Sequence, residues 1–268
     1  MDQTIARTGT VNGRLWGHAV NDWAKRQEAT LDPVFEEVLK RTQVGVGTRY
    51  LDLGCGAGKA AAMAIARGAT VTGLDASEQM LQIARSRAPQ AVFDQADLED
   101  LPYDDAAFDV VTAFNAIQYA ATPSNALHEA GRVTTPSGTV AVVTWGQPDG
   151  MEAAQLLAAL KPLLPPPPPG APGPFALSDE ERLRDFAREG GLDALDVFDV
   201  ESPWNYPDEK TALSGLRSSG VACKAIEHSG KDRVDAAHAA ALAPFRRQDG
   251  SFVIGASFRV LLARRSAL

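Results

Sequence analysis

A glycine-rich turn carries the first chemical signal in this sequence. In "YLDLGCGAGK", Gly54, Gly56 and Gly58 alternate with other residues shortly after Asp52, and Asp75 follows 17 residues after Gly58. Glycines between a strand and a helix let a ligand approach the backbone, and the free helix N-terminus offers N–H groups to it. The spacing therefore predicts a nucleoside-containing ligand on this turn.

The glycine spacing distinguishes a dinucleotide from a ligand without a pyrophosphate. A dinucleotide fingerprint has the form G-x-G-x-x-G and sets a pyrophosphate against the helix N-terminus. Lys59 stands where that fingerprint needs its third glycine. The observed G-x-G-x-G instead suits a ligand without a pyrophosphate, whose amino-acid part lies along the turn. A nicotinamide-dependent oxidoreductase is disfavoured for this reason.

Two aspartates are placed to hold a nucleoside. Asp75 ends the second predicted strand, where its carboxylate can accept both hydroxyls of a ribose. Asp97 follows the third strand in "QADLEDLPY", where it can accept from an exocyclic amine such as that of adenine. Asp75 also begins a D-x-x-E pattern with Glu78, so the alternative is that it caps the next helix. A cap does not explain the placement of Asp97.

Apolar runs of strand length alternate with segments of helical period around these residues. The expected strands are 48–54, 69–75, 91–97, 108–118 and 137–146, and the expected helices are 59–68, 77–88 and 124–134. This order predicts an α/β fold with a doubly wound parallel sheet, whose ligands lie beyond the carboxyl ends of the strands.

The alternation stops after Gly150. A short helical segment runs into residues 165–169, which are all proline and predict a stiff extended connector, with a ligand for a proline-binding module as the alternative. Residues 195–204 and 251–264 are strand candidates. Residues 208–245 between them are helical in composition and predict an insertion over one end of the sheet.

Composition excludes several classes of partner. The 26 basic and 34 acidic residues give a net charge of −8, which opposes binding to nucleic acid. Cys55 and Cys223 are the two cysteines, too few for a disulfide framework or a zinc cluster. We therefore expect a cytoplasmic protein without a structural metal. No apolar run approaches the ~18 residues of a membrane span, so no membrane partner is expected. A homodimer is compatible with the sequence, which does not define the oligomeric state.

The motifs taken together resemble a known family. Asp52 to Gly58, Asp75, Ala96-Asp97-Leu98 and "FDVVTAFNAIQY" are similar to class I S-adenosylmethionine (SAM)-dependent methyltransferases, of the seven-stranded Rossmann-like type with small-molecule substrates. The resemblance covers residues 48–146 and depends on several motifs in the right order. It implies a mostly parallel seven-stranded sheet and SAM as cofactor, released as S-adenosylhomocysteine. The implied organisation is a helical cover (1–45), a SAM-binding core (46–150), a lid with one late core strand (151–250) and the final strand (251–268).

The resemblance also implies roles for individual residues. The methionine part of SAM would lie against Asp52, Gly54, Cys55, Gly56 and Gly58, with the sulfonium beside Asn115 and Ala116. The ribose would contact Asp75 and Ala76, and the adenine would contact Met80, Asp97 and Leu98. Met80 is equally consistent with a core residue.

Differences from the motifs of other methyltransferase groups limit the classes of substrate that we expect. Residues 114–117 read Phe-Asn-Ala-Ile, unlike the Asn-Pro-Pro-Tyr-like motif of methyltransferases that act on amide or amino nitrogens of macromolecules. Two cysteines are too few for arsenite methylation, and no carboxylate set suggests a magnesium-dependent catechol enzyme. A metal-free site is expected.

Candidate acceptor-site residues lie mainly outside the motifs. Methyl transfer is an in-line displacement, so alignment and desolvation can supply most of the rate, and a base is needed only for an acceptor that loses a proton early. His18 and His228 are candidate bases, and Tyr119 can orient a substrate by hydrogen bonding. The predicted aromatic walls are Trp16, Trp23, Tyr119 and Trp145, with core packing as the alternative for the first two.

Two functions follow from this interpretation. The first is a SAM-dependent methyltransferase of a small, apolar or aromatic metabolite. The second is a SAM-binding protein that uses the cofactor for a rearrangement or cyclisation without methylation, or as a sensor. The sequence does not identify the accepting atom, which can be oxygen, nitrogen, carbon or sulfur.

Overall fold

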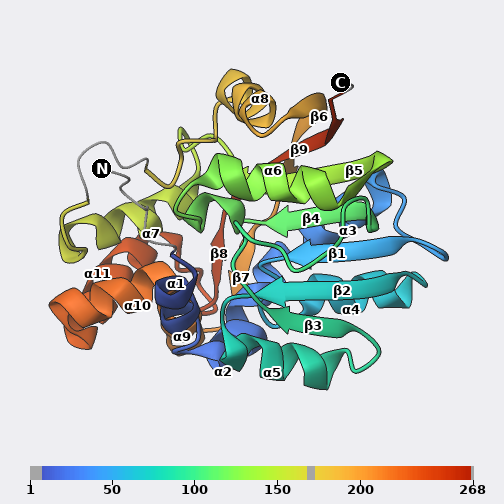
Figure 1. Ribbon diagram of the computed structural model, residues 1–268. Helices are drawn as coiled ribbons and strands as arrows, with labels where there is room; N and C mark the ends of the chain where they lie inside the picture. Colours follow the sequence, from blue (N-terminus) through green and yellow to red (C-terminus); the bar gives the residue numbers. More distant parts are fainter. Residues whose placement is uncertain (1–7, 168–172, 267–268) are drawn as a thin grey trace, which may run out of the picture.

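A seven-stranded sheet forms the centre of the computed structural model, which describes residues 8–167 and 173–266. The strand order is β3-β2-β1-β4-β5-β9-β6 (Figure 1). Strands β1 to β5 are parallel to their neighbours, whereas β9 runs antiparallel to both β5 and β6. The strands are β1 (Arg49–Leu53), β2 (Thr70–Asp75), β3 (Val92–Gln95), β4 (Phe108–Phe114), β5 (Thr134–Trp145), β6 (Leu192–Glu201) and β9 (Ser257–Arg265). The predicted α/β class and mostly parallel seven-stranded sheet are confirmed.

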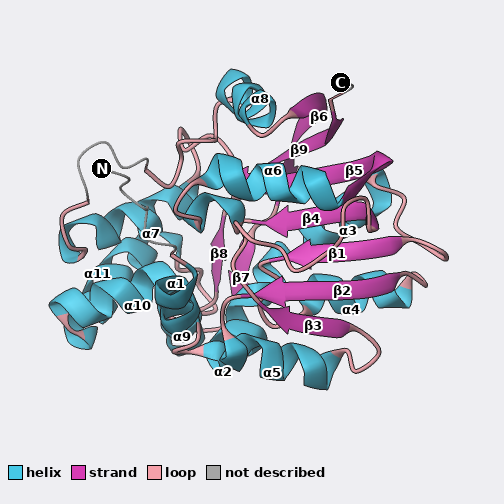
Figure 2. Cartoon of the chain, in the orientation of Figure 1, coloured by secondary structure: helices cyan, strands magenta, loops and turns pink. Residues whose placement is uncertain are grey.

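Helices cover both faces of this sheet (Figure 2). On one face, α6 (Pro123–Val133) and α8 (Glu180–Glu189) bury Leu127 and Phe186 against the strands. On the other face, the packing helices are α3 (Asp32–Arg41), α4 (Lys59–Ala66) and α5 (Glu78–Arg87). Because both faces are covered, the central strands are apolar runs rather than alternating sequences.

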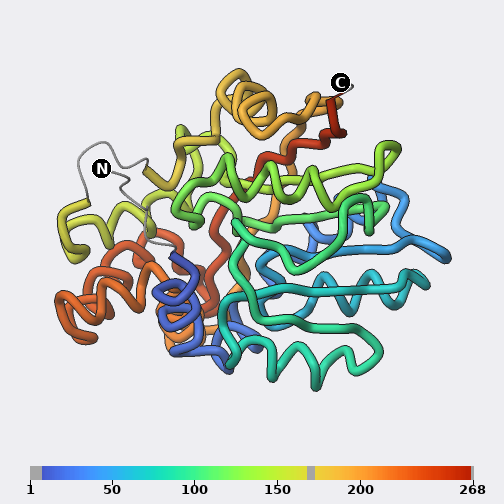
Figure 3. The backbone as a smooth tube through the Cα atoms, in the orientation of Figure 1, coloured from blue at the N-terminus to red at the C-terminus, as the bar shows by residue number. Residues whose placement is uncertain are grey.

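The remaining helices gather beyond the carboxyl ends of β1 to β4, toward which the arrowheads point in Figure 1. Figure 3 traces the same segments as a tube coloured along the chain. The N-terminal part contributes α1 (Gly9–Trp16), α2 (Val20–Asp22), the π-helix η1 (Trp23–Gln27) and the 3-10 helix η2 (Glu28–Leu31). The later part contributes α7 (Glu152–Leu160), α9 (Glu209–Arg217), α10 (Gly220–Ser229) and α11 (Lys231–Leu242). We call α9, α10 and α11 the lid helices. Short 3-10 turns complete the set: η3 (Ile117–Tyr119), η4 (Lys161–Leu163) and η5 (Ala243–Phe245).

The expected single strand over 251–264 is divided in two. Its first part, β8 (Phe252–Ile254), pairs with β7 (Trp204–Tyr206) in a separate two-stranded sheet, and its second part is β9. The break occurs at Gly255, whose N–H donates to Glu152 Oε2 at 2.5 Å and whose carbonyl accepts from Ala153 N at 3.0 Å. The start of α7 therefore occupies main-chain groups that a continuous strand would give to its neighbours.

The proline-rich connector lies partly outside the described residues. Residues 165–167 have no regular secondary structure, and Pro168 and Pro169 are not described. In the part of the chain that the structure covers, no helix has the length and apolar character needed to cross a bilayer.

Candidate functional site

The glycine turn between β1 and α4 is held in a conformation that favours glycine. Gly54, Gly56 and Gly58 have φ values of 69°, 53° and 79°, in the left-handed region. A Cβ on Gly54 would lie 2.4 Å from Ala116 Cβ, and one on Gly58 would lie 2.8 Å from Ala84 Cβ. Larger side chains would therefore push the turn away from both α5 and the segment after β4.

Asp75 at the end of β2 fixes this turn. Its Oδ2 accepts from Gly56 N at 2.9 Å and its Oδ1 accepts from Ser77 N at 2.8 Å. Burial raises the pKa of Asp75, while these backbone N–H groups act in the opposite direction. Each carboxylate oxygen keeps acceptor capacity, so two ligand hydroxyls can still bind. The N-cap of α5 is Ser77 and not Asp75, because the Ser77 hydroxyl accepts from Met80 N at 3.3 Å.

Asp52 is buried at the end of β1, where it belongs to a hydrogen-bonded group of side chains. Its Oδ1 accepts from the hydroxyl of Thr112 at 3.1 Å, and Thr112 shares a 2.6 Å hydrogen bond with the hydroxyl of Tyr50. Burial raises the pKa of Asp52 to about 8, although the hydrogen bond from Thr112 lowers it. In the absence of a ligand, most of this carboxyl is therefore protonated at neutral pH.

A cavity opens at the carboxyl ends of the parallel strands, with about 790 Å³ of space between atoms, part of it open to solvent. It brings together many of the predicted residues. Its walls are Thr8, Gly9, Asn12, Trp16, Trp23, Leu31, Gly54, Gly56, Asp75, Ala76, Met80, Asp97, Leu98, Phe114, Asn115, Ala116, Tyr119 and Ala120. Met80, for which a core role was the alternative, is both almost fully buried and part of this wall.

Helix α1 covers the cavity beyond the carboxyl ends of the parallel strands (Figure 1). Gly9 N donates to Asp97 Oδ2 at 3.2 Å. The hydroxyl of Thr8 and the side-chain amide of Asn12 donate to the carbonyl of Tyr119, at 2.9 and 2.7 Å. The N-terminal segment therefore touches the predicted adenine-binding carboxylate and the segment after β4.

The face of α1 that makes this contact consists of glycines, which the sequence analysis did not single out. A Cβ on Gly9 would lie 2.5 Å from Asp97 Oδ2, and one on Gly13 would lie 2.3 Å from the carbonyl oxygen of Ala76. A Cβ on Gly17 would lie 2.7 Å from Gln79 Oε1 and 2.8 Å from Ser77 Oγ, at the start of α5. The repeat of glycine at every fourth residue in "GTVNGRLWG" was the available signal, because residues four apart share one helix face.

Two polar side chains follow β4, of which Asn115 forms part of the cavity wall and Gln118 is bonded to it. Asn115 has φ of 51°, unusual for a residue other than glycine, and its Oδ1 accepts from Gln118 Nε2 at 2.5 Å. Gln118 Oε1 is buried without a hydrogen-bond partner among the described residues. Strained and unpartnered groups of this kind collect at functional sites. Gln118 was not identified from the sequence.

Three aromatic rings form another wall. Trp16 contacts Trp23 edge to face with ring centroids 5.0 Å apart, and it contacts Tyr119 at 5.6 Å. Burial raises the pKa of Tyr119 to about 12. Its hydroxyl therefore stays protonated at neutral pH and can serve as a hydrogen-bond donor, but not as a general base.

Several predicted residues lie away from the cavity wall. His18 is exposed and borders a separate open depression, and His228 is exposed on α10. Trp145 is buried and stacks on Phe258 at 4.7 Å, because the end of β5 packs against β9 rather than against the cavity. Asp52, Cys55 and Gly58 lie behind the wall.

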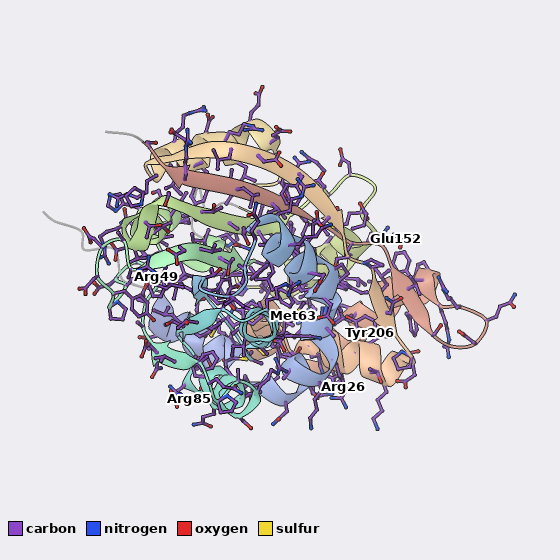
Figure 4. All side chains as sticks on the ribbon, turned by 90° about the vertical axis from the view of Figure 1, so that its right-hand side faces the viewer. Arg26, Arg49, Met63, Arg85, Glu152 and Tyr206 are labelled. Atoms are coloured by element: carbon purple, nitrogen blue, oxygen red, sulfur yellow. The ribbon has the colours of Figure 1, made fainter. Side chains whose placement is uncertain are left out.

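A buried network joins the π-helix η1 and the following turn to both the glycine turn and the lid helices. Glu28 Oε1 accepts from Lys59 N at 3.3 Å, at the start of α4, and Glu28 Oε2 pairs with Arg87. The hydroxyl of Tyr206 donates to Gln27 Oε1 at 2.7 Å. Figure 4 labels Tyr206 beside Arg26, whose guanidinium donates to a hydroxyl of α9 at 3.2 Å. None of these partners is close in sequence, so no local pattern could have revealed the network.

The chemistry of the wall fits SAM. The carboxylates of Asp75 and Asp97 suit ribose hydroxyls and an adenine amine, and the open glycine turn admits an amino-acid chain. No Lys or Arg of the part of the chain that the structure describes forms the wall, so no side chain placed there would neutralise a phosphate chain.

Comparisons with known proteins find methyltransferases among the similar proteins. Residues 51–142 match the family model described as a methyltransferase domain. The chain is 29% identical over 231 residues to the 27-O-demethylrifamycin SV methyltransferase of Amycolatopsis mediterranei, with 80% of each chain covered. It is 31% identical over 148 residues to an uncharacterised protein of Mycobacterium tuberculosis, a match that covers 54% of this chain and 52%, about half, of that relative. The crystal structure of the cyclase SpnF superposes with a TM-score of 0.58 at 25% identity, covering 88% of this chain and 82% of that one.

The fold and the site define a class I, Rossmann-like methyltransferase domain. The strand order with one antiparallel strand beside β5, the glycine turn and the matched residues 51–142 all point to this class. Over residues 51–142 the chain is similar to methyltransferases, in agreement with the family that its motifs predicted.

Proposed function

We propose that this protein transfers a methyl group from SAM to a small, apolar or aromatic metabolite. The observation that carries the proposal is the composition of a single cavity wall. Asp75 and Asp97 form its nucleoside end, and Trp16, Trp23 and Tyr119 form an aromatic surface beside the glycine turn. SAM would supply an electrophilic methyl group on a sulfonium.

The side chains of the protein have defined tasks in this proposal. Asp75 accepts from the ribose hydroxyls, Asp97 accepts from the adenine amine, and the aromatic walls exclude water and align the acceptor. The protonated hydroxyl of Tyr119 donates a hydrogen bond that orients an oxygen or nitrogen of the acceptor. Among the described residues, the wall contains no His, Lys or Glu, which supports catalysis by alignment rather than by a strong base.

A small-molecule acceptor is supported by the relatives. One of them is named as a methyltransferase of demethylrifamycin SV, which is a small molecule. The closed position of α1 over the cavity also favours a compact acceptor over a nucleic acid or a protein. A cytoplasmic location and a possible homodimer belong to the same proposal.

A second candidate function is a SAM-dependent rearrangement or cyclisation without methyl transfer. The likeness to the cyclase SpnF favours it. The cofactor residues would be the same in both functions, and only the fate of the methyl group would differ.

Methyl-labelled SAM separates the two functions. With a panel of small apolar and aromatic compounds, we expect label in the product together with an equal amount of S-adenosylhomocysteine. An altered product without label, with SAM unconsumed, would favour the second function. Calorimetry that detects binding of neither SAM nor S-adenosylhomocysteine would refute both.

A further inference from the structure

The backbone donors of the glycine turn are almost all used within the protein. Gly54 N and Cys55 N both donate to the carbonyl of Leu74, at 2.7 and 3.0 Å. Gly58 N donates to the carbonyl of Cys55 at 2.9 Å. The N–H of Gly56 is taken by Asp75 and that of Lys59 by Glu28. From 54 to 59, only the N–H of residue 57 has no hydrogen-bond acceptor among the described residues.

This leaves the carboxylate of the methionine part of SAM with few partners. The start of α4, the usual place for an anion after such a turn, already holds the carboxylate of Glu28. Asp52 and Asp75 add further acidic groups around the turn, and the cavity wall formed by residues 8–167 and 173–266 contains no Lys, Arg or His. A carboxylate brought out of water without donors is strongly disfavoured, so another donor must face the turn.

Trp23 supplies such a donor. A Cβ built on Gly56 would lie 3.5 Å from Trp23 Nε1, which places the indole N–H directly over the turn. Trp23 shares the cavity wall with Gly54 and Gly56, and no described residue accepts a hydrogen bond from its indole. An indole N–H is a donor only, and that of the half-buried Trp23 is open to a ligand in the cavity.

The position of this indole is fixed from two sides. Trp23 begins the π-helix η1, a rare form that is frequent at functional sites. Trp16 packs against its ring at 5.0 Å. On the far side of η1, Gln27 and Glu28 are anchored to Tyr206 and to the start of α4. The N–H is therefore held in place before any ligand arrives.

We infer that the indole N–H of Trp23 binds the carboxylate of the methionine part of SAM. Trp23 is then a cofactor-binding residue, rather than the acceptor wall that the sequence predicted. The inference rests on the proposed function only for the identity of the cofactor. It predicts that Trp23 distinguishes ligands that carry this carboxylate from ligands that lack it.

The test compares SAM with decarboxylated SAM, which keeps the sulfonium and the ammonium group. Calorimetry would give the affinity of each ligand for the unaltered protein and for Trp23→Phe, which removes the N–H and keeps an aromatic ring. We expect the ratio of the SAM affinity to the decarboxylated SAM affinity to fall about ten- to hundredfold in the variant, the range for a hydrogen bond to a charged group.

Two controls separate hydrogen bonding from packing. Trp204→Phe removes an indole N–H of β7 that lies outside the cavity wall, so it should leave the ratio unchanged. Benzothienylalanine at position 23 replaces the N–H by sulfur with the bicyclic shape kept, and it should reproduce the effect of Trp23→Phe even if that variant folds poorly.

The calorimetry distinguishes failure of this inference from failure of the proposed function. If the unaltered protein binds SAM but the ratio is the same with both position-23 replacements, the inference is wrong and the proposed function stands. If the unaltered protein binds neither SAM nor S-adenosylhomocysteine, the proposed function itself fails.

Discussion

The buried carboxyl of Asp52 gives the most quantitative prediction. Its pKa in the folded protein is about 8, against an ordinary value of 3.8 that applies to the unfolded chain. Between these two values the unfolded chain is ionised while the folded protein holds the proton. Folding therefore takes up a proton, and the free energy of unfolding falls as pH rises, by about 1.4 kcal/mol per pH unit for this one group.

Asp52→Asn removes this titration with almost no change in shape, and its amide oxygen can still accept from Thr112. Integration of the two titrations from about pH 5 to about pH 7.5 gives a relative gain of about 3 kcal/mol for the variant. The variant should be close to the wild type in stability at the lower pH and clearly more stable at the higher pH.

Urea unfolding at several pH values, followed by tryptophan fluorescence, measures this difference. The buried carboxyls of Asp75 and Glu28, whose pKa values burial also raises, are present in both proteins, so the comparison reports mainly on Asp52. Stability curves that stay parallel across this pH range would refute the reasoning. A confirmed difference would mean that the protein keeps a carboxylate that lowers its stability, as expected for a binding site rather than for a scaffold.

Further predictions test the site. Asp75→Ala should weaken SAM binding by roughly 2–4 kcal/mol, since two hydrogen bonds to a carboxylate are lost, and unchanged binding in calorimetry would contradict the ribose assignment. Gly13→Val should displace α1 from the loop that it contacts, lower SAM affinity about tenfold or more and expose residues 1–28 to protease, whereas an unchanged digestion pattern would show that α1 is not required for closure. His18→Ala and His228→Ala should each keep turnover within about tenfold of the wild type, and a loss beyond about 10³-fold in kcat for either variant would identify a base. Trp145→Ala should lower the free energy of unfolding by about 3–5 kcal/mol, which urea unfolding would measure.

The sequence by itself determined the cofactor end of the site. The positive φ angles of Gly54, Gly56 and Gly58 are local requirements that only glycine meets without strain, so the pattern is visible in the chain. Asp75 and Asp97 could be placed because the carboxyl ends of parallel strands meet at one edge of a sheet. The same local logic gave the fold class, since strand and helix periods depend only on neighbouring residues.

The tertiary structure alone decided what covers that site. Whether Trp145 faces the cavity or the core, and whether Gly13 faces a loop or water, depends on how α1 and β9 dock against segments far away in the chain. The buried pairs of Glu28 with Lys59 N and of Gln27 with Tyr206 join residues up to 179 positions apart. Such contacts are set by the packing of distant surfaces, and a packing surface leaves no fixed spacing in the sequence for a local pattern to reveal.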